Sequence, residues 1–456
     1  MCASIAKIVE QFKQSWSQEL TEQAIERAVR ETGHKWRDRK LDPITTIRLF
    51  FLQILCGNPA CNALPRLARR KFTGSAYCTA RGRVPLQALE TLLTRTTSKM
   101  AAAVRDTGLW LGHRLFVVDG SSFSMPDTKE LQEHFGQSGA QADGCGFPIA
   151  RWLALVHYGS GLFQKALTAP LRMHDMSRVT QLHPELQAGD VLLGDRAFCS
   201  FPHLALLISA GLHALLRAHQ KLIVDFTPGR AHFISKTAKR KGKKSNPQTL
   251  PRSRWIAKLG PMDQIVEWFR PAQCPAWMSA ETFAQLPATL QVRELRYKIA
   301  RPGYRVREIT LVTTLLDANT YTAADLAEAY GLRWTIETNF GHLKTTMKMD
   351  VLHCKTVRGV LKELTMFLLV YNLVRMTMLE AARRQDVPVE RISFIDALRW
   401  LATAEPGDEL PHLVINPLRR GRAEPRVRKR RPKNYKSMTQ PRDALRNALL
   451  QPEVAA

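Results

Sequence analysis

Residues 330–344 have the sequence Tyr330-Gly-Leu-Arg333-Trp-Thr-Ile-Glu337-Thr-Asn-Phe-Gly-His-Leu-Lys344. On a helix, at about 100° per residue, the side chains of Tyr330, Arg333, Glu337 and Lys344 fall within about 60° of one another. They form one polar stripe, in which a carboxylate is flanked by two cations. Arg333 and Lys344 are suited to hold phosphate groups on either side of Glu337.

The residues around this stripe predict a helix over residues 322–346. Thr322 and Asp325 form a capping-box pattern at its start. The faces beside the stripe are apolar, with Trp334, Ile336, Phe340 and Leu343. Such a helix would place Glu337 beside a sheet. The alternative is an ordinary amphipathic helix, in which Arg333 pairs with Glu337 four residues later.

Two short apolar runs, residues 114–119 and 191–195, have the pattern of buried strands, and each ends in an aspartate. A buried carboxylate without a partner is costly, so Asp119 and Asp195 need an explanation. Each alone is most simply a turn or cap residue that accepts hydrogen bonds from nearby amides. Two at adjacent strand ends favour a shared divalent cation, because neighbouring carboxylates need a neutralising charge. Mg²⁺ fits such a pair, since it binds carboxylates, water and phosphate oxygen.

The charge balance indicates a polyanionic partner. The 456 residues contain 67 lysines and arginines against 40 aspartates and glutamates, a formal net charge of +27. Two runs, residues 236–244 and 419–436, carry much of this excess, but the rest of the chain is also basic. No segment reaches about 18 uninterrupted apolar residues, and no N-terminal stretch has the pattern of a signal peptide. We therefore favour nucleic acid over a membrane, and expect a cytoplasmic protein.

Other chemistries leave no pattern in the sequence. The chain has no P-loop and no GxSxG nucleophile elbow, which disfavours ATP use and serine hydrolase chemistry. The 8 cysteines include no CxxC pair, so a zinc module is not expected. We interpret most of these thiols as small buried hydrophobic groups.

The predicted elements change along the chain. Residues 1–112 are helical, residues 113–218 alternate strands with helices, and residues 219–316 favour strands. Helices return over residues 317–404, and residues 405–456 form a Pro- and Arg-rich tail that we expect to order only on a partner. We predict an α/β core interrupted by a β-rich insertion. An all-helical N-terminal domain precedes it, and its basic surface is either a solvated face or a DNA contact.

Finer signals predict individual elements. Pro43 and Pro85 lie where helices would start. Residues 204–216 predict a helix that leads into a short strand. Further strands are predicted over residues 264–269, 290–297 and 306–314. Residues 236–246 are too polar for a core element and are expected to form an exposed basic loop.

The arrangement Tyr330-x2-Arg333-x3-Glu337-x6-Lys344 resembles the signature helix of the DDE transposases of bacterial insertion sequences. More specifically, it resembles the insertion-sequence-four group of that family. The four-residue signature is specific, whereas the aspartate motifs alone are weak.

The resemblance covers about residues 114–379. It extends to Asp119-Gly-Ser-Ser-Phe-Ser-Met-Pro-Asp-Thr128 and to Gly194-Asp195-Arg-Ala-Phe198. The first two acidic positions are 76 residues apart, and 142 residues separate the second from Glu337. The longer gap has room for the β-rich insertion found in this group.

This resemblance implies an RNase H-like catalytic core. It casts Asp119, Asp195 and Glu337 as catalytic residues and as ligands of two Mg²⁺ ions, for which Mn²⁺ could substitute. One ion would activate water or a 3′-hydroxyl while the other stabilises the leaving oxygen. It also casts Tyr330, Arg333 and Lys344 as DNA-binding residues that contact phosphates near the element's end.

The activity implied is excision and integration of an insertion sequence by phosphodiester hydrolysis and strand transfer. Its partners would be double-stranded DNA, both inverted-repeat ends and target, and a second copy of the chain in a synaptic complex. We expect such a protein in the bacterial cytoplasm, associated with the nucleoid. The alternatives are an inactive, DNA-binding transposase remnant that represses, a standalone RNase H-like endonuclease, and a basic nucleic-acid packaging protein.

Relatives in this group excise through a DNA hairpin and hold a flipped base on an insertion-domain tryptophan. No tryptophan lies in the strands just before Glu337, and the candidates here are Trp255, Trp268 and Trp277. Trp268 lies on a predicted strand and is as readily a core residue, so the hairpin step stays open. Residues 33–40 also resemble part of the N-terminal helical region of some group members, and that region is our first choice for recognising the terminal repeat.

Overall fold

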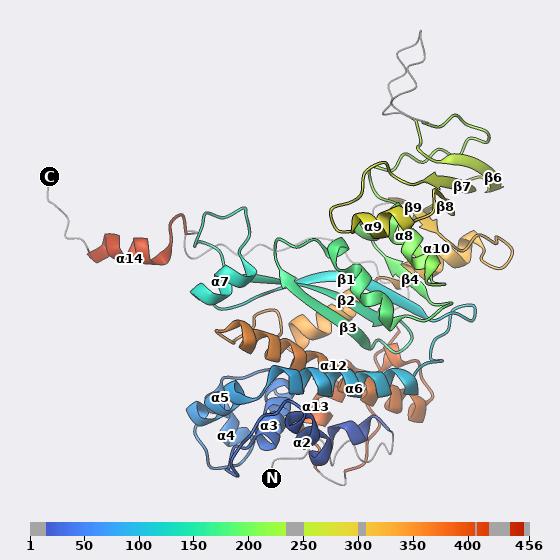
Figure 1. Ribbon diagram of the computed structural model, residues 1–456. Coiled ribbons are helices and arrows are strands. Elements are labelled where there is room, and N and C mark those ends of the chain that lie inside the picture. The colour runs from blue at the N-terminus through green and yellow to red at the C-terminus, as the bar shows by residue number, and fades with distance from the viewer. Residues whose placement is uncertain (1–14, 234–249, 300–306, 406–407, 419–437, 451–456) are drawn as a thin grey trace, which may run out of the picture.

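The computed structural model describes residues 15–233, 250–299, 307–405, 408–418 and 438–450. Within them the fold is mixed α/β, as predicted. Nine strands form one sheet in the order β3-β2-β1-β4-β5-β9-β8-β7-β6, and helices cover it (Figure 1). The predicted basic loop 236–246 and the basic run 419–436 lie outside the described residues.

The centre of the sheet is parallel. Strands β1, β4 and β5 pair in parallel, β2 pairs antiparallel to β1, and β3 pairs antiparallel to β2. Their bounds are Leu115–Ser124, Val191–Gly194, His213–Arg217, Ile149–His157 and Phe163–Pro170, in that order. Successive side chains of a strand point to opposite faces. Val117 and Leu193 therefore join one hydrophobic core, whereas Phe116 and Val118 join a second core on the other face.

The β-rich segment continues this sheet rather than forming one of its own. Strand β9 pairs with β5 through Leu215 and Thr313, and β8, β7 and β6 follow in antiparallel order. Their bounds are Arg307–Thr313 for β9, Thr289–Ile299 for β8, Asp263–Phe269 for β7 and Arg254–Gly260 for β6. The strands predicted over 264–269, 290–297 and 306–314 are thus confirmed within the described residues. A short helix, α9 (Ala280–Gln285), was not predicted.

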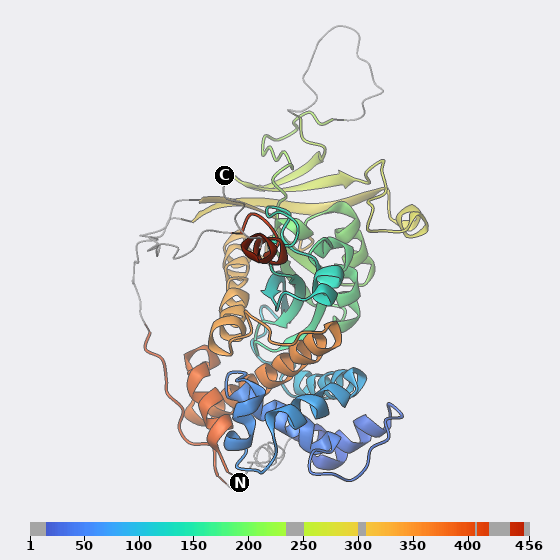
Figure 2. The same cartoon turned by 90° about the vertical axis from the view of Figure 1, so that its left-hand side faces the viewer.

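The N-terminal region is helical over the residues described. Pro43 is the first residue of one helix and Pro85 the N-cap of another, which confirms both as helix starts. The helices are α2 (Glu22–Arg30), α3 (Pro43–Leu55), α4 (Leu64–Leu67), α5 (Gly74–Arg83) and α6 (Leu86–Ala103). Figure 2 shows them at the opposite end of the molecule from β6–β9.

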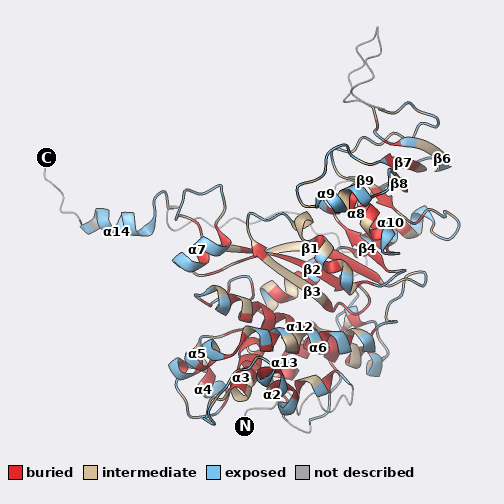
Figure 3. Ribbon diagram, in the orientation of Figure 1, coloured by how far each residue is buried: buried red, intermediate tan, exposed pale blue. Residues whose placement is uncertain are grey.

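These helices share a core with the C-terminal half of the chain. Helix α12 (Val357–Gln385) packs against α6 and α3, and α13 (Phe394–Thr403) packs against α12. Among the described residues α12 is the one helix long and apolar enough to cross a membrane, and 83% of its most apolar window is buried inside the protein. It is red along most of its length in Figure 3. This helix is therefore the central core helix of the fold.

A buried polar cluster joins the N-terminal helices to α12. Glu363 is 0% exposed, and its carboxylate accepts hydrogen bonds from the Asn58 side chain at 2.5 Å and from the backbone N–H groups of His353 and Cys354 at 3.0 and 2.9 Å. The neighbouring Lys362 donates through Nζ to the carbonyl of Gly82 at 2.8 Å. The partners lie after α3, in α5 and just before α12, so the cluster fixes these three segments against α12.

The predicted helix over 322–346 is broken. The capping box of Thr322 and Asp325 is present, and α10 runs from Ala323 to Leu332. Arg333 and Trp334 then form a tight turn, because their N–H groups bond three residues back, to Tyr330 and Gly331. The chain continues as α11 (Thr335–Gly341) and a π-helical turn (342–346). Trp334 is 47% exposed, so the apolar face that we predicted beside the stripe is not buried at that position.

Beyond α13 the described tail contains one helix. Helix α14 (Arg442–Leu450) lies apart from the rest of the fold in Figure 1, and its described side chains are exposed. Pro441, which precedes it, lies against Gly144 of the loop before β2.

Candidate active site

Asp119 and Asp195 lie side by side because β1 and β4 pair in parallel. The last paired positions are Val118 and Gly194, so the next residue on each strand is one of the two aspartates. Both have the strand parity of Val117 and Leu193, which point into the same core. The sequence-based expectation of two carboxylates at adjacent strand ends is met at β4. It is wrong in detail at β1, which continues to Ser124 by pairing with β2.

Both oxygens of Asp119 have partners. Oδ1 accepts the N–H of Gly120 at 2.8 Å, and Oδ2 accepts Nη1 of Arg333 at 2.8 Å. Burial raises the pKa of Asp119 above its usual value, the guanidinium of Arg333 opposes that shift, and the charges of Asp195 and Glu337 add to it. The three carboxylates therefore lie in one electrostatic environment.

Asp195 is also a helix cap. Its Oδ1 accepts the N–H of Ala197 at 2.7 Å at the start of a short 3₁₀ turn, Arg196–Phe198. Asp195 therefore does act as a helix cap, the alternative that the sequence left open, through its Oδ1 atom. The second oxygen, Oδ2, accepts no hydrogen bond within the described residues. A carboxylate that only caps a helix would leave this oxygen free as well, so the free oxygen does not distinguish the two roles.

Glu337 faces the same edge from α11. Its side chain is 51% exposed, and Oε1 lies 3.8 Å from Nη2 of Arg333. Ile336 is fully buried and Phe340 is 7% exposed, and both join the core beneath the sheet. These two contacts hold α11 against β1 and leave Glu337 at the surface.

The sequence suggested that Arg333 is free to hold a phosphate. In the structure it lies between two carboxylates instead. It bonds Asp119 and pairs with Glu337, so the ion pair that formed our alternative for this helix is present. Its guanidinium carbon lies 5.9 Å from the Tyr330 ring centroid and 5.3 Å from that of Trp334. Its Nε is buried and has no hydrogen-bond partner within the described residues.

Tyr330 and Lys344 occupy different surroundings from each other. Tyr330 is 3% exposed, and its hydroxyl has a raised pKa because of burial. Lys344 lies in the π-helical turn, where its Nζ is 5.1 Å from the ring centroid of Phe123 on β1. Burial lowers the pKa of Lys344. The four signature residues thus do not form one continuous stripe, because the turn at 333–334 and the π-helical turn change the helical phase.

A fourth carboxylate lies nearby, and sequence analysis missed it. Asp175 begins a 3₁₀ turn, Asp175–Ser177, and its Oδ2 is 2.7 Å from where a Cβ on Gly120 would stand. Burial raises its pKa, Arg151 opposes the shift at an Nη1–Oδ1 distance of 3.8 Å, and the charge of Asp195 adds to it. No spacing or strand pattern marks Asp175, since it lies in a loop.

The donor chemistry of this edge suits a hard divalent cation, since carboxylate oxygens converge there. The side chains as placed do not form a closed ligand set. Within the residues that the structure describes, no group of three or more His, Cys, Asp or Glu side chains is spaced to hold a metal ion. Arg333 lies between two of these carboxylates, Asp119 and Glu337.

Of the tryptophans considered for base stacking, Trp255 and Trp268 lie on β6 and β7, and Trp277 lies in a turn before α9. Trp268 is 8% exposed and donates its Nε1–H to the buried Glu294 at 3.0 Å, which confirms the core interpretation. Trp255 is partly buried, and its Nε1 has no partner among the described residues. Trp277 is half-buried.

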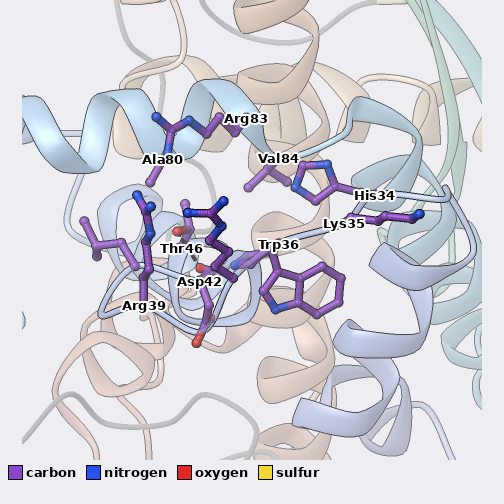
Figure 4. A pocket seen from close by; sticks show the side chains of 12 residues that line it. His34, Lys35, Trp36, Arg39, Asp42, Thr46, Ala80, Arg83 and Val84 are labelled. Atoms are coloured by element: carbon purple, nitrogen blue, oxygen red, sulfur yellow. Dashed lines mark hydrogen bonds between the residues drawn. The ribbon is translucent and has the colours of Figure 1, made fainter.

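A surface pocket of about 320 Å³ lies in the N-terminal region, away from the carboxylates (Figure 4). Its cationic lining comes from Lys35, Arg37, Arg39 and Arg83, with Trp36 and His34 beside them. The acid in the lining, Asp42, caps α3 by accepting the N–H of Thr45 at 2.6 Å. Those four cations make no salt bridge with any other residue that the structure describes. The pocket is therefore strongly cationic.

Comparison with known proteins points to one family. The profile of a family described as "Transposase DDE domain" matches residues 110–373. Over 380 residues, 79% of this chain and 77% of the relative, the chain is 25% identical to the transposase InsG of insertion sequence element IS4 from Escherichia coli. It is 28% identical to the putative transposase InsZ of Escherichia coli over 190 residues, 41% of this chain and 61% of that relative's length.

Among solved structures, the chain is similar to a piggyBac transposase in a synaptic complex with hairpin DNA. The match has a TM-score of 0.44 and 8% identity, and covers 83% of this chain and 75% of that one.

Proposed function

Because the chain belongs to the DDE transposase family, we propose that it excises and integrates an insertion sequence by Mg²⁺-dependent phosphodiester hydrolysis and strand transfer. Asp119, Asp195 and Glu337 are its catalytic residues in this proposal. The observation that carries it is the approach of the segment around Arg333 and Glu337 to the two aspartates on β1 and β4.

The three carboxylates would hold divalent metal ions, which enzymes of this family use. Mg²⁺ suits oxygen ligands that leave room for water and phosphate, and Mn²⁺ is a possible substitute. Bound there, the metal supplies an activated oxygen nucleophile and charge stabilisation for the leaving oxygen. Asp119 and Asp195 are held in place by β-pairing, and α11 presents Glu337 from the opposite side.

Tyr330, Arg333 and Lys344 would contact DNA phosphates in this proposal. Arg333 and Lys344 supply positive charge at the edge where the scissile phosphate must lie. The hydroxyl of Tyr330 can donate a hydrogen bond. Because the Tyr330 side chain is only 3% exposed, a DNA phosphate can contact it only through the small part that reaches the surface.

We divide the chain into functional parts as the sequence suggested. Residues 1–112 form the helical DNA-binding domain, residues 113–218 and 317–404 the two parts of an RNase H-like core, residues 219–316 the β-rich insertion and residues 405–456 the basic tail. The parallel β1, β4 and β5 with antiparallel β2 and β3 support the core assignment.

The cationic pocket of Figure 4 supports the DNA-binding role of the N-terminal part. Lys35, Arg37, Arg39 and Arg83 line it without salt bridges among the described residues, so their charge is available to a phosphate backbone. Since the pocket lies away from the carboxylates, a duplex could contact both regions at once.

Excision requires two element ends to be held together, so we propose a homodimer in the synaptic complex. Its DNA partners are the inverted-repeat ends and the target. We also place the protein in the bacterial cytoplasm, on the nucleoid, where those partners are.

The test combines end DNA, target plasmid and Mg²⁺ with the full chain and with Asp119→Asn, Asp195→Asn and Glu337→Gln. Asp143→Asn is the matched control, because Asp143 is an exposed carboxylate in a loop. We expect each site variant to lose cleavage and joining by about 10³-fold or more, while the control keeps both.

The outcomes separate the alternatives. Cleavage without joined product would indicate a standalone endonuclease, and binding without cleavage in the unaltered chain would indicate a repressing remnant. Full cleavage by all three site variants would refute the assigned mechanism.

A further inference from the structure

We propose that Arg333 is an internal counter-ion that competes with the catalytic cation for Asp119, so that cation binding and DNA binding are coupled through one side chain. This rests on the proposed function, because it assumes that the three carboxylates hold a divalent metal.

The geometry of the ion pair carries the first step. Nη1 of Arg333 lies 2.8 Å from Oδ2 of Asp119, and Nη2 lies 3.8 Å from Oε1 of Glu337. One guanidinium therefore bridges two of the three carboxylates. Any cation shared by those carboxylates would have to occupy the same region.

The second oxygen of Asp119 is partly occupied as well. Oδ1 already accepts the backbone N–H of Gly120 at 2.8 Å. A cation on either oxygen would share this one carboxylate with the guanidinium of Arg333, which already bonds Oδ2. Two positive charges cannot share one partly buried carboxylate oxygen without mutual repulsion.

The arginine itself is incompletely bonded where it lies. Its side chain is 11% exposed, and its buried Nε–H has no acceptor within the described residues. A buried donor without a partner costs free energy. Release toward a phosphate would let the guanidinium form the paired bonds that suit its shape.

Its place in the chain permits such release. Arg333 lies in the tight turn between α10 and α11, where its N–H bonds Tyr330 rather than continuing the α-helical pattern. The rings of Tyr330 and Trp334 flank the guanidinium at 5.9 and 5.3 Å. Trp334 is about half-exposed, so the guanidinium is covered on one side by a side chain that reaches the surface.

The functional consequence is cooperative assembly. A cation displaces Arg333 from Asp119, and the freed guanidinium is available to a DNA phosphate. By linkage, DNA that holds Arg333 away from Asp119 must strengthen cation binding by the same factor. The protein without DNA would then bind the cation weakly, which limits cleavage away from a bound end.

A supporting role for Arg333 makes the opposite prediction. If the arginine only held Asp119 in position for the metal, removing it would weaken cation binding. If it competes, removing it strengthens cation binding, so the sign of the change distinguishes the two roles.

The experiment measures Mn²⁺ binding to the full chain without DNA, from the loss of the free Mn²⁺ signal in electron paramagnetic resonance. It compares the unaltered chain with Arg333→Ala and Arg333→Lys, and uses Asp119→Asn to define the site. Arg196→Ala is the matched control. Arg196 follows Asp195 directly, is exposed and bonds the side chain of Gln220 at 2.8 Å, so its loss removes an equal charge near the site without freeing a carboxylate.

We expect Arg333→Ala to bind Mn²⁺ about tenfold more tightly than the unaltered chain, since a charge-assisted hydrogen bond is of that strength. Arg333→Lys keeps the charge and should stay within about threefold of the unaltered chain, as should Arg196→Ala. Unchanged or weaker binding by Arg333→Ala, at a site that Asp119→Asn removes, would overturn the proposal and leave the metal site intact. No Mn²⁺ binding sensitive to Asp119→Asn in any variant would overturn both.

A second readout uses DNA and a cation that does not support cleavage. Fluorescence anisotropy of a labelled duplex, at matched ionic strength, should show Ca²⁺ tightening DNA binding by about fivefold in the unaltered chain. Arg333→Ala should lose this coupling while Arg196→Ala keeps it. Equal coupling in Arg333→Ala would contradict the proposal.

Discussion

Asp119 and Glu363 are both carboxylates with buried atoms and nearby nitrogen donors, yet they are bonded in opposite ways. Glu363 accepts one side-chain N–H and two backbone N–H groups, all neutral and all fixed by the fold. Asp119 accepts one backbone N–H and one side-chain cation that a metal can replace. A carboxylate that supports the fold is saturated by donors that cannot leave. A carboxylate that acts chemically keeps one exchangeable partner.

The largest effect should come from removing the saturated carboxylate. Glu363→Gln places an amide NH₂ against backbone N–H groups at a site that is 0% exposed. We expect the free energy of unfolding to fall by about 3 kcal/mol or more, measured by urea denaturation. Glu133→Gln, at a side chain 68% exposed, is the control and should change it by less than about 0.5 kcal/mol. A loss below about 1 kcal/mol for Glu363→Gln would break the comparison.

Gly120→Ala should have the next largest effect, because a Cβ there would stand 2.7 Å from Oδ2 of Asp175. We expect a loss of about 1–3 kcal/mol in unfolding free energy, together with reduced cleavage as Asp175 and the β1 edge shift. Gly139→Ala is the control, since its Cβ would meet nothing within 4 Å.

The double variant Gly120→Ala/Asp175→Ala tests the cause. It should recover part of the lost stability, because the clash is absent. No recovery would show that the cost arises elsewhere in β1.

Acid should destabilise the fold through a buried histidine pair. His183 and His203 lie with their Nε2 atoms 3.1 Å apart, and burial lowers their pKa values to about 4 and about 3. A histidine with a lowered folded pKa stays neutral while the unfolded chain takes up a proton. Stability is therefore complete above about pH 6.5 and falls as the pH drops toward 4, by at most about 1.4 kcal/mol per pH unit for each proton.

Urea denaturation at a series of pH values measures this slope. His183→Gln should make it shallower, because one proton-uptake site is removed. An equal slope in that variant would assign the acid sensitivity to other groups.

The smallest change in stability should come from the catalytic carboxylate. Asp119→Asn removes a charge whose burial is unfavourable and also weakens the bond from Arg333, so the two effects offset each other. We expect the free energy of unfolding to change by less than about 0.5 kcal/mol while strand cleavage is lost. A loss as large as that of Glu363→Gln would instead assign Asp119 a structural role.

Local patterns in the sequence predicted much of the scaffold. Pro43, Pro85 and the Thr322–Asp325 capping box mark helix starts because they act on backbone groups within a few residues. The alternating and apolar runs predicted the strands on both sides of the site. Side-chain period and capping are local, so sequence alone is sufficient for them.

Other features depend on packing between distant segments. The break at Arg333 and the exposure of Trp334 do not follow from a helical period, which predicts one continuous stripe. Asp175 is brought to Gly120 only when its loop folds over the sheet. The joining of β9 to β5 made one sheet from strands that the sequence assigned to two units.

The sequence by itself therefore determined the element types, the basic charge and the acidic positions that the family signature marks. Tertiary structure alone decided what those acidic groups contact. The bond between Arg333 and Asp119 joins residues 214 positions apart. Such a contact depends on how β1, β4 and α11 pack, because hydrogen bonds and charges act over a few ångströms in space, whatever the separation along the chain.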